Sequence, residues 1–516
     1  MKKIITLLTI VLLCATQLSS AAKDSIYNTN NLRTLFLNNE AVIYALNVRT
    51  FNAKDKNNDE IIDLDGGEES GTFINAIENL NAISNLGINT IHLLPITPVG
   101  KIKALGTAGS LYAITDFTTI NPQLHDKKSK LSLEGQARLF FDECHKRNIR
   151  VIVDLPSCGS YELYLKNPDL FLLDRRQQPI IPADWTDVRL FKTLNPDGTL
   201  NQELLELHKR FVDMAMSLGA DGIRADVAPC KPYEFWEELI KYARKKDPEF
   251  LFLAEASNSW TTPVCEAAVY TDYKRLLDAG FDGYYGSYFN YKNWKNVSEL
   301  KKQVLLDQHL SSKGSEKKSV IGSFATHDEL SPILVGKSNF SKTIMWLNAT
   351  LPLNPYYVDG FTTGDNYMYG YGNKRAAKTY TDDDYYYVHK GKLDIFNFSR
   401  APGGPDTKII NTLFLSLKLR EYAKEAITKG NFKTLYSNNS SVFCFTRSFG
   451  GKTVIVITNT NLNEKQKCKI RLPGINQNTN IMPIAFTNSP TVTKGTISIN
   501  LEPAETAVLY LGNFKF

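Results

Sequence analysis

Eight short apolar runs recur along the first 360 residues of the chain, and amphipathic stretches separate several of them. Runs of this length bounded by turn residues predict buried strands, and apolar positions at helical spacing predict helices. The predicted strands cover 42–48, 89–95, 150–156, 221–227, 250–256, 281–286, 320–326 and 354–360, and the predicted helices include 71–86, 132–148, 201–218 and 232–247. This alternation favours an α/β fold, a (β/α)8 TIM barrel with its site at the carboxyl rim of the strands. The alternative is an open doubly wound sheet, but no Gly-rich phosphate loop follows the first strand.

Two segments depart from the alternation. Residues 157–200, after the third strand, are polar and contain prolines, which predicts a small inserted subdomain. From about residue 431 the pattern changes to short alternating runs separated by turn residues, which is typical of antiparallel sheet. We therefore expect a barrel over 23–430 and a C-terminal β-sandwich domain over 431–516.

The first 22 residues have the order of a secretory signal: Lys2 and Lys3, an apolar stretch from Ile4 to Leu13, and small residues up to Ala22. We expect a cleavable signal peptide over 1–22 and a secreted or periplasmic protein. The alternative is an N-terminal membrane anchor, for which the apolar stretch is short.

Composition narrows the choice of partner. The chain has 516 residues, 43% of them hydrophobic, and a formal net charge of only +6. It is long enough to bury a large core, and without a basic cluster interleaved with aromatic residues nucleic acid is a poor candidate. No second apolar run approaches 20 residues, so we expect no stable membrane span in the mature chain. The sequence leaves the oligomeric state undetermined.

Three acidic residues stand at the ends of separate predicted strands: Asp226, Glu255 and Asp328. Carboxylates presented at one rim of a sheet suit glycoside hydrolysis, in which one carboxylate is a nucleophile and one carboxylic acid donates a proton. Arg224 lies two residues before Asp226 on the same strand face, where its charge favours an ionised Asp226. Glu255 follows the apolar run FLFLA, where desolvation would keep it protonated. The alternatives are a barrel-lining ion pair for Arg224 and Asp226, and a surface position for Glu255.

Four segments in order resemble the motifs of the α-amylase superfamily, glycoside hydrolase family 13: VIVDLPSC, GIRADVAPC, FLAEA and SFATHD. The resemblance implies that Asp226 is the nucleophile, Glu255 the general acid/base and Asp328 a carboxylate that holds sugar hydroxyls. It also implies sugar contacts for Tyr112 and Asp116 in SLYAITDF, and for His327. Core packing is the alternative for Tyr112, and a structural role for His327.

The same motifs contain departures from the family. After Asp154 the asparagine and histidine of the first motif are missing, Thr326 replaces the asparagine before His327, and the fourth-strand motif ends in Pro229-Cys230. These replacements affect expected contacts with the sugar. Cys158 and Cys230 each lie four residues after the aspartate of neighbouring strands, so we hypothesise a disulfide between them, with free thiols as the alternative. Cys444 and Cys468 are a second candidate pair, within the C-terminal sheets.

The loop DKNNDEIID after the first strand predicts a calcium site. Oxygen ligands at alternating positions, as in an EF-hand loop, would come from Asp55, Asn57, Asp59, Asp63 and the carbonyl of Ile61. The loop also resembles a metal-binding loop of oligosaccharide-cleaving family members. Calcium would be structural; a solvated acidic turn is the alternative.

Together with these features, the family resemblance implies a secreted, retaining enzyme that cleaves α-glucosidic bonds in an α-glucan or maltooligosaccharide. Two alternatives stay open: an α-glucan transglycosylase with the same catalytic residues, and a catalytically weak glucan-binding relative. Aromatic residues around 281–294 and 349–367 are candidates either for glucose stacking or for loop packing.

Overall fold

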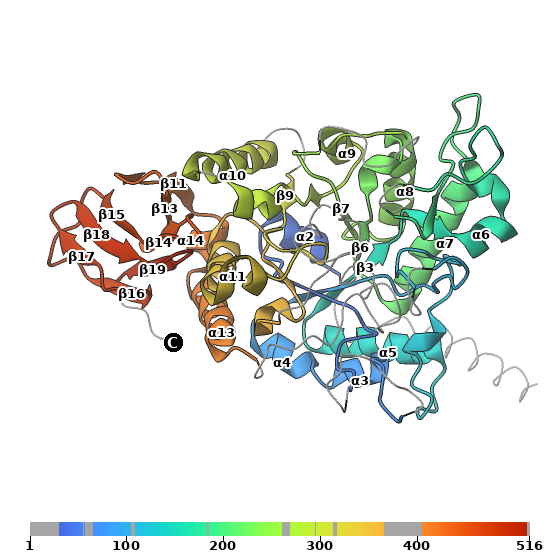
Figure 1. Cartoon of the computed structure of the whole chain (residues 1–516), viewed down its shortest axis with the longest axis horizontal. Helices are drawn as coiled ribbons and strands as arrows, with labels where there is room; N and C mark the ends of the chain where they lie inside the picture. Colours follow the sequence, from blue (N-terminus) through green and yellow to red (C-terminus); the bar gives the residue numbers. More distant parts are fainter. Residues whose placement is uncertain are drawn as a thin grey trace, which may run out of the picture.

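The computed structural model describes residues 30–54, 56, 66–104, 109–182, 185–260, 269–294, 296–312, 317–365 and 405–512. Its centre is an eight-stranded parallel sheet in the order β10-β1-β2-β3-β6-β7-β8-β9 (Figure 1). The strands are β1 (Ile43–Leu46), β2 (Thr90–Leu93), β3 (Arg150–Leu155), β6 (Gly222–Ala225), β7 (Leu251–Ala254), β8 (Gly283–Tyr284), β9 (Ser319–Val320) and β10 (Tyr356–Val358). Each falls within or overlaps one of the predicted apolar runs.

The sheet closes into a barrel at its two outer strands. Ile321 and Asn354, next to β9 and β10, form a parallel bridge. The Asn354 N–H donates to the Val320 carbonyl at 3.0 Å, and the Gly322 N–H donates to the Asn354 carbonyl at 2.8 Å. These contacts join the two edge strands of the sheet, β9 and β10, to each other. The predicted TIM barrel is therefore confirmed.

Helices surround the barrel and cover the outer face of its strands. The strands are therefore buried on both faces, and their sequences are continuous apolar runs. The longer helices are α5 (Leu133–Lys146), α7 (Gln202–Leu218), α8 (Tyr233–Lys246), α10 (Val297–Ser312), α11 (Pro332–Thr350) and α13 (Thr407–Tyr422). The shorter ones are α2 (Leu32–Leu37), α3 (Phe73–Ile77), α4 (Leu80–Asn85), α9 (Tyr273–Asp278) and α14 (Lys424–Thr428). Helix α7 shows how local sequence sets the bounds: the Asn201 side chain accepts from the Leu204 N–H, and Gly219 ends the helix at φ 104°.

The segment after β3 holds a small antiparallel pair, β4 (Cys158–Ser160) with β5 (Val188–Leu190), and the short helix α6 (Tyr161–Lys166). It projects beside α7 and α8 at the end of the molecule opposite the C-terminal sheets (Figure 1). Cys158 and Val188 pack together with Val227 in a separate apolar cluster. The insert therefore reaches the rim near β6.

The C-terminal region forms two antiparallel sheets, in the orders β11-β13-β14-β19-β16 and β12-β15-β18-β17. The strands are β11 (Asn431–Thr434), β12 (Tyr436–Ser437), β13 (Val442–Phe449), β14 (Lys452–Asn459), β15 (Gln466–Arg471), β16 (Ile481–Ala485), β17 (Thr491–Thr493), β18 (Thr496–Leu501) and β19 (Thr506–Leu511). Alternate residues of β13 point to opposite faces: Val442 and Cys444 pack with the four-stranded sheet, and Phe443 and Phe445 belong to the barrel core.

The hypothesised Cys444–Cys468 disulfide is not formed, since both cysteines are free and buried. They belong to strands of different sheets, and Cys468 Sγ instead contacts the Ile499 carbonyl of the neighbouring strand at 3.8 Å. The Cys468 thiol thus donates to the backbone of its own sheet and is not bonded to Cys444, although both side chains lie in the same apolar cluster.

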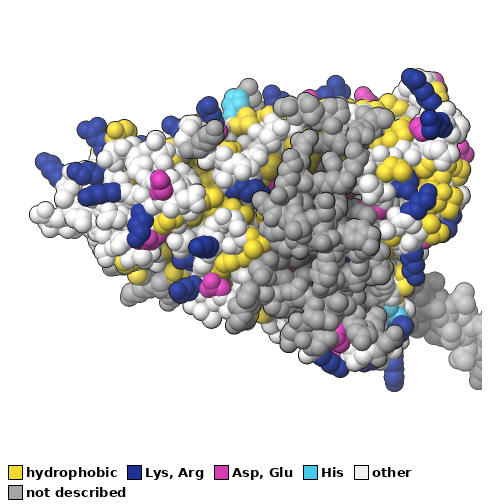
Figure 2. All heavy atoms as spheres, viewed as in Figure 1, with side chains coloured by type: hydrophobic (Ala, Val, Ile, Leu, Met, Phe, Trp, Pro, Cys, Tyr) yellow, Lys and Arg dark blue, Asp and Glu magenta, His cyan; other side chains and the backbone are white. Residues whose placement is uncertain are grey.

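Two further observations concern the surface and the loops. No helix in the described part of the chain is both long and apolar enough to cross a bilayer. On the face shown in Figure 2, Lys and Arg side chains lie at the edge of the molecule and over the C-terminal sheets. All five predicted calcium ligands, Asp55, Asn57, Asp59, Ile61 and Asp63, lie outside the described residues, so calcium stays a prediction.

Candidate active site

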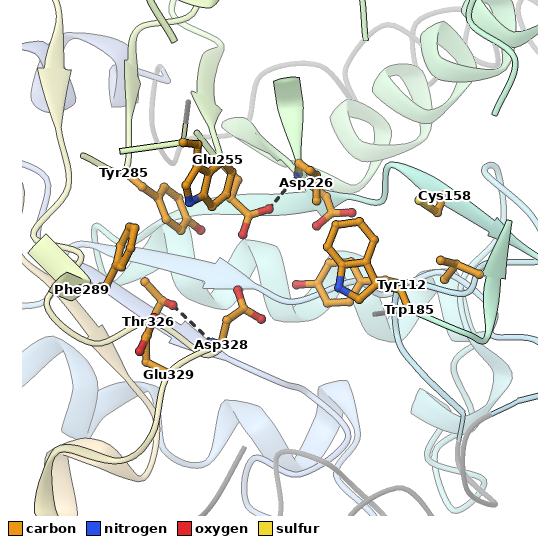
Figure 3. A pocket seen from close by; sticks show the side chains of 13 residues that line it. Tyr112, Cys158, Trp185, Asp226, Glu255, Tyr285, Phe289, Thr326, Asp328 and Glu329 are labelled. Atoms are coloured by element: carbon orange, nitrogen blue, oxygen red, sulfur yellow. Dashed lines mark hydrogen bonds between the residues drawn. The ribbon is translucent and has the colours of Figure 1, made fainter. Parts of the chain in front are cut away.

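Three carboxyl groups face one cavity of about 290 Å³ at the carboxyl rim of the barrel (Figure 3). Asp226 directly follows β6, Glu255 directly follows β7, and Asp328 lies beyond β9. Asp226 and Glu255 are only 8% and 7% exposed. Both line the cavity, so a ligand would reach them while bulk water is largely excluded.

Arg224 contacts two of these carboxyl groups. Its Nη1 lies 3.0 Å from Asp226 Oδ1, and its Nη2 lies 2.8 Å from Glu255 Oε1. The Nη2 contact is ionic, because Nη2 makes no well-directed hydrogen bond. Nη1 also donates to both oxygens of Asp154, at 2.8 and 2.9 Å. One buried guanidinium therefore faces three carboxyl groups.

Backbone N–H groups hold the other oxygens of the pair. The Ser157 N–H donates to Asp226 Oδ2 at 3.0 Å, and the Val227 N–H donates to Glu255 Oε2 at 2.7 Å. Val227 has a left-handed backbone, with φ 36° and ψ 54°. That conformation costs a β-branched residue about 1–3 kcal/mol. The strained turn places its N–H against Glu255.

Burial raises the pKa of all three carboxyl groups, because a desolvated carboxylate is less stable than the neutral acid. The pKa of Asp226 rises to about 8, and those of Glu255 and Asp328 each to about 7, with Arg224 opposing the shift in every case. The site therefore holds protons near neutral pH. The sequence predicts that Arg224 acts on Asp226, and the structure places the same charge against Glu255 as well.

A buried polar network lies beneath the cavity. The Tyr112 hydroxyl donates to Asp154 Oδ2 at 2.9 Å and lies 2.9 Å from His327 Nε2. The Tyr112 and His327 rings are stacked, with centroids 6.1 Å apart and an interplanar angle of 9°. Burial and the charge of Arg224 hold the pKa of His327 well below its usual range, so the imidazole is neutral. Neutral His327 and Tyr112 are thus fixed beside the carboxyl groups.

Aromatic side chains form much of the cavity wall. Trp185 comes from the insert, Trp260 from the segment after β7, and Tyr285 and Phe289 from the segment after β8 (Figure 3). Neighbouring aromatic residues pack in the core: the hydroxyls of Tyr284 in β8 and of Tyr288 after it donate to buried Asp307 at 2.6 and 2.7 Å. The aromatic residues around 281–294 thus contribute both to the cavity wall and to the core, and glucose stacking stays a prediction.

The chain is similar to enzymes that act on α-glucans. No protein-family model matches it. A maltosyltransferase of Bifidobacterium animalis subsp. lactis, named for α-1,4-glucan and maltose 1-phosphate, is 28% identical over 207 residues, or 38% of this chain and 28% of that protein. An α-amylase of Haloarcula japonica is 27% identical over 232 residues, or 42% of this chain and 29% of that protein. The matches span less than a third of either relative.

The fold agrees over a longer span. The crystal structure of an α-amylase from Lactobacillus plantarum superposes with a TM-score of 0.65 at 18% identity, covering 92% of this chain and 99% of the other. The chain is thus similar in sequence to α-glucan enzymes over part of its length, and it shares the fold of an α-amylase over nearly all of it.

The positions that correspond to superfamily motifs are largely gathered at the cavity. Tyr112, Asp226, Glu255 and Asp328 line it, and Arg224 and His327 lie directly behind. Asp116 is not among the lining residues; its Oδ1 accepts instead from the N–H and hydroxyl of Thr118. Thr326, at the position of the superfamily asparagine, lines the cavity, and its Oγ1 accepts from the Asp328 N–H at 3.3 Å.

Several lining residues were missed from the sequence: Trp185, Val188, Trp260 and Glu329. No spacing rule connects the two tryptophans to the motifs. For Glu329 the adjacent Asp328 was a usable signal. Glu329 forms an ion pair with Lys292, which belongs, like Phe289, to the segment after β8.

The hypothesised Cys158–Cys230 disulfide is wrong. Cys158 is a free thiol, and Cys230 is bonded in a disulfide to a different cysteine. Both side chains lie in the same small apolar cluster, so neighbouring strand ends do bring them near each other. Proximity alone did not fix the pairing, because another partner already holds the Cys230 sulfur.

Proposed function

We propose that the chain is a retaining glycoside hydrolase that cleaves α-glucosidic bonds of α-glucans. The observation that carries the proposal is the shared contact of Asp226 and Glu255 with the Arg224 guanidinium at the cavity. Retaining enzymes need a nucleophile and an acid about 5–5.5 Å apart, and two carboxyl groups on one guanidinium suit so short a separation.

In the first step an Asp226 oxygen attacks the anomeric carbon, and the bond from that carbon to the leaving oxygen breaks. The Glu255 proton passes to the leaving oxygen. Glu255, now ionised, then takes a proton from water, and the water oxygen attacks the anomeric carbon and releases Asp226. The raised pKa of Glu255, about 7, keeps a proton available to it, but the pKa of Asp226 is raised to about 8, so these values do not by themselves assign the two roles.

The walls of the cavity support a sugar substrate. Tyr112, Trp185, Trp260 and Tyr285 present ring surfaces, and a pyranose offers a face of C–H groups that packs on such rings. Asp328, opposite the other two acids, is available to accept from sugar hydroxyls (Figure 3). The names of the relatives favour an α-glucan as the sugar.

Turnover of maltooligosaccharides by wild type, Asp226→Asn and Glu255→Gln tests the proposal. We expect Asp226→Asn to reduce turnover to background, and Glu255→Gln to lose about 10²–10⁴-fold. In NMR of the wild-type reaction the first product should be the α-anomer. Asp213→Asn, which alters a 43% exposed carboxylate on α7, is the matched control and should retain full activity. A first product in the β-configuration would overturn the retaining mechanism.

A transferase is the second candidate, favoured by the maltosyltransferase among the relatives. It would use the same two carboxyl groups, with a sugar hydroxyl in place of water in the second step. Adding maltose as acceptor separates the two: a transferase yields longer oligosaccharides at the expense of free sugar.

A further inference from the structure

The proposed mechanism needs Asp226 ionised and Glu255 protonated, yet Arg224 does not distinguish them. Its two terminal nitrogens lie 3.0 Å from one carboxyl group and 2.8 Å from the other. Burial raises the pKa of Asp226 to about 8 and that of Glu255 to about 7, an order opposite to the one that the mechanism needs. Another feature must favour the charge on Asp226.

Lys231 lies behind the cavity wall and is only 1% exposed. It directly follows η4 (Ala228–Cys230), and its Nζ donates to Ser157 Oγ at 2.6 Å and to the Ser157 carbonyl at 3.2 Å. Within the described ranges no carboxylate lies within ion-pair distance of Lys231. Burying an ammonium group without a paired carboxylate is costly, so its position favours a functional role.

Ser157 connects Lys231 to the proposed nucleophile. Ser157 accepts a hydrogen bond from Lys231, and its backbone N–H donates to Asp226 Oδ2 at 3.0 Å. Lys231 therefore fixes both the carbonyl and the hydroxyl of Ser157 while Ser157 holds Asp226. The connection joins the ends of β3 and β6.

The charged groups around Lys231 single out Asp226. The field of Asp226 raises the pKa of Lys231, against burial, which lowers it to about 8. Of the other two titratable neighbours, burial raises the pKa of the Cys158 thiol to about 12, and burial with Lys231 lowers that of His208 on α7 well below its usual range. Both are neutral at pH 7. Glu255 responds instead to Arg224, Asp328 and Asp154.

We propose that Lys231 is a positioning residue for the nucleophile: through Ser157 it orients Asp226, and its charge favours ionised Asp226, so that the proton of the pair resides on Glu255. This inference rests on the proposed hydrolase function. Ser157 and Lys231 lie in or beside the two segments that depart from the superfamily motifs, after Asp154 and around Pro229-Cys230. The two segments that differ from the superfamily motifs are thus in contact through the Lys231–Ser157 hydrogen bond.

The test is the pH profile of kcat/KM for wild type, Lys231→Met and Ser157→Ala on a maltooligosaccharide. Removing the charge should move the acid limb of Lys231→Met upward by about one pH unit, equivalent to about a tenfold loss on that limb. The loss should fall on kcat more than on KM, since Lys231 does not line the cavity. Ser157→Ala, which removes one acceptor of the ammonium, should shift the limb in the same direction by less.

Lys274→Met, which removes an exposed lysine on α9, is the control and should leave the profile unchanged. An unmoved acid limb in folded Lys231→Met would overturn the inference. If that variant does not fold, an unchanged limb and kcat in Ser157→Ala would overturn it. In both cases wild-type turnover that Asp226→Asn abolishes would leave the proposed hydrolase intact, whereas absence of wild-type turnover would remove both proposals.

Discussion

Asp226 binds its proton far more tightly in the folded chain than in the unfolded chain. Burial raises its pKa from 3.8 to about 8. Because the folded pKa is raised, the stability that this group contributes is complete below the unfolded pKa and is lost as the pH rises through about 8. The proposed nucleophile therefore opposes folding at the pH at which it would work.

Asp226→Asn should consequently raise Tm, by an amount that increases as the pH rises from about 4 to about 8, because asparagine does not ionise. Calorimetric scans at several pH values over this range check the expectation. The exposed control Asp213→Asn should show no comparable trend. A Tm difference that stays constant with pH would contradict this account.

At the scale of elements, the predicted calcium loop is closed at its base. Lys54 and Glu69 form an antiparallel bridge with N–H to carbonyl distances of 2.8 and 3.2 Å. The Lys56 N–H donates to Glu68 Oε1 at 2.8 Å. The two ends of the loop are thus held together independently of the predicted ligands.

We expect a chelator to lower Tm and added Ca²⁺ to restore it, because a cation at 100 times its Kd stabilises the folded state by about 2.7 kcal/mol. Thermal scans with EDTA, Ca²⁺ and Mg²⁺ measure the effect. In Asp59→Asn/Asp63→Asn the response to the chelator should disappear. An identical Tm with EDTA and with Ca²⁺ would favour the solvated acidic turn.

At the scale of the whole molecule, one face of the five-stranded C-terminal sheet is part of the barrel core. Phe443, Phe445, Val454 and Tyr510 belong to the same buried cluster as the barrel residues. Thr343 of α11 also donates to the Ala504 carbonyl at 2.6 Å. We therefore expect the two parts to unfold in one transition.

Phe445→Ala should destabilise the whole chain by about 3–5 kcal/mol, because it opens a cavity in the shared core. Denaturant unfolding followed by intrinsic fluorescence and by loss of activity should give coincident, shifted midpoints. Phe449→Ala, at a 45% exposed position of the same strand, should change stability by less than about 0.5 kcal/mol. Separate transitions for activity and fluorescence would show that the parts unfold independently.

The sequence by itself determined the features that depend on local order. The eight strands follow from apolar runs, α7 begins at its Asn201 cap and ends at Gly219, and Asp226 and Glu255 follow their strands directly. The periodicity of apolar residues and the helix-capping residues depend only on neighbours within a few positions, so both can be recognised from the sequence alone.

Only the tertiary structure decided which groups meet. Three contacts join segments that are far apart in the chain: Arg224 with Glu255, Trp185 with the cavity, and Lys231 with Ser157. Strand register, the path of the insert and the competition among buried charges set these contacts. None of the three has a local signature, because each depends on how the whole barrel closes.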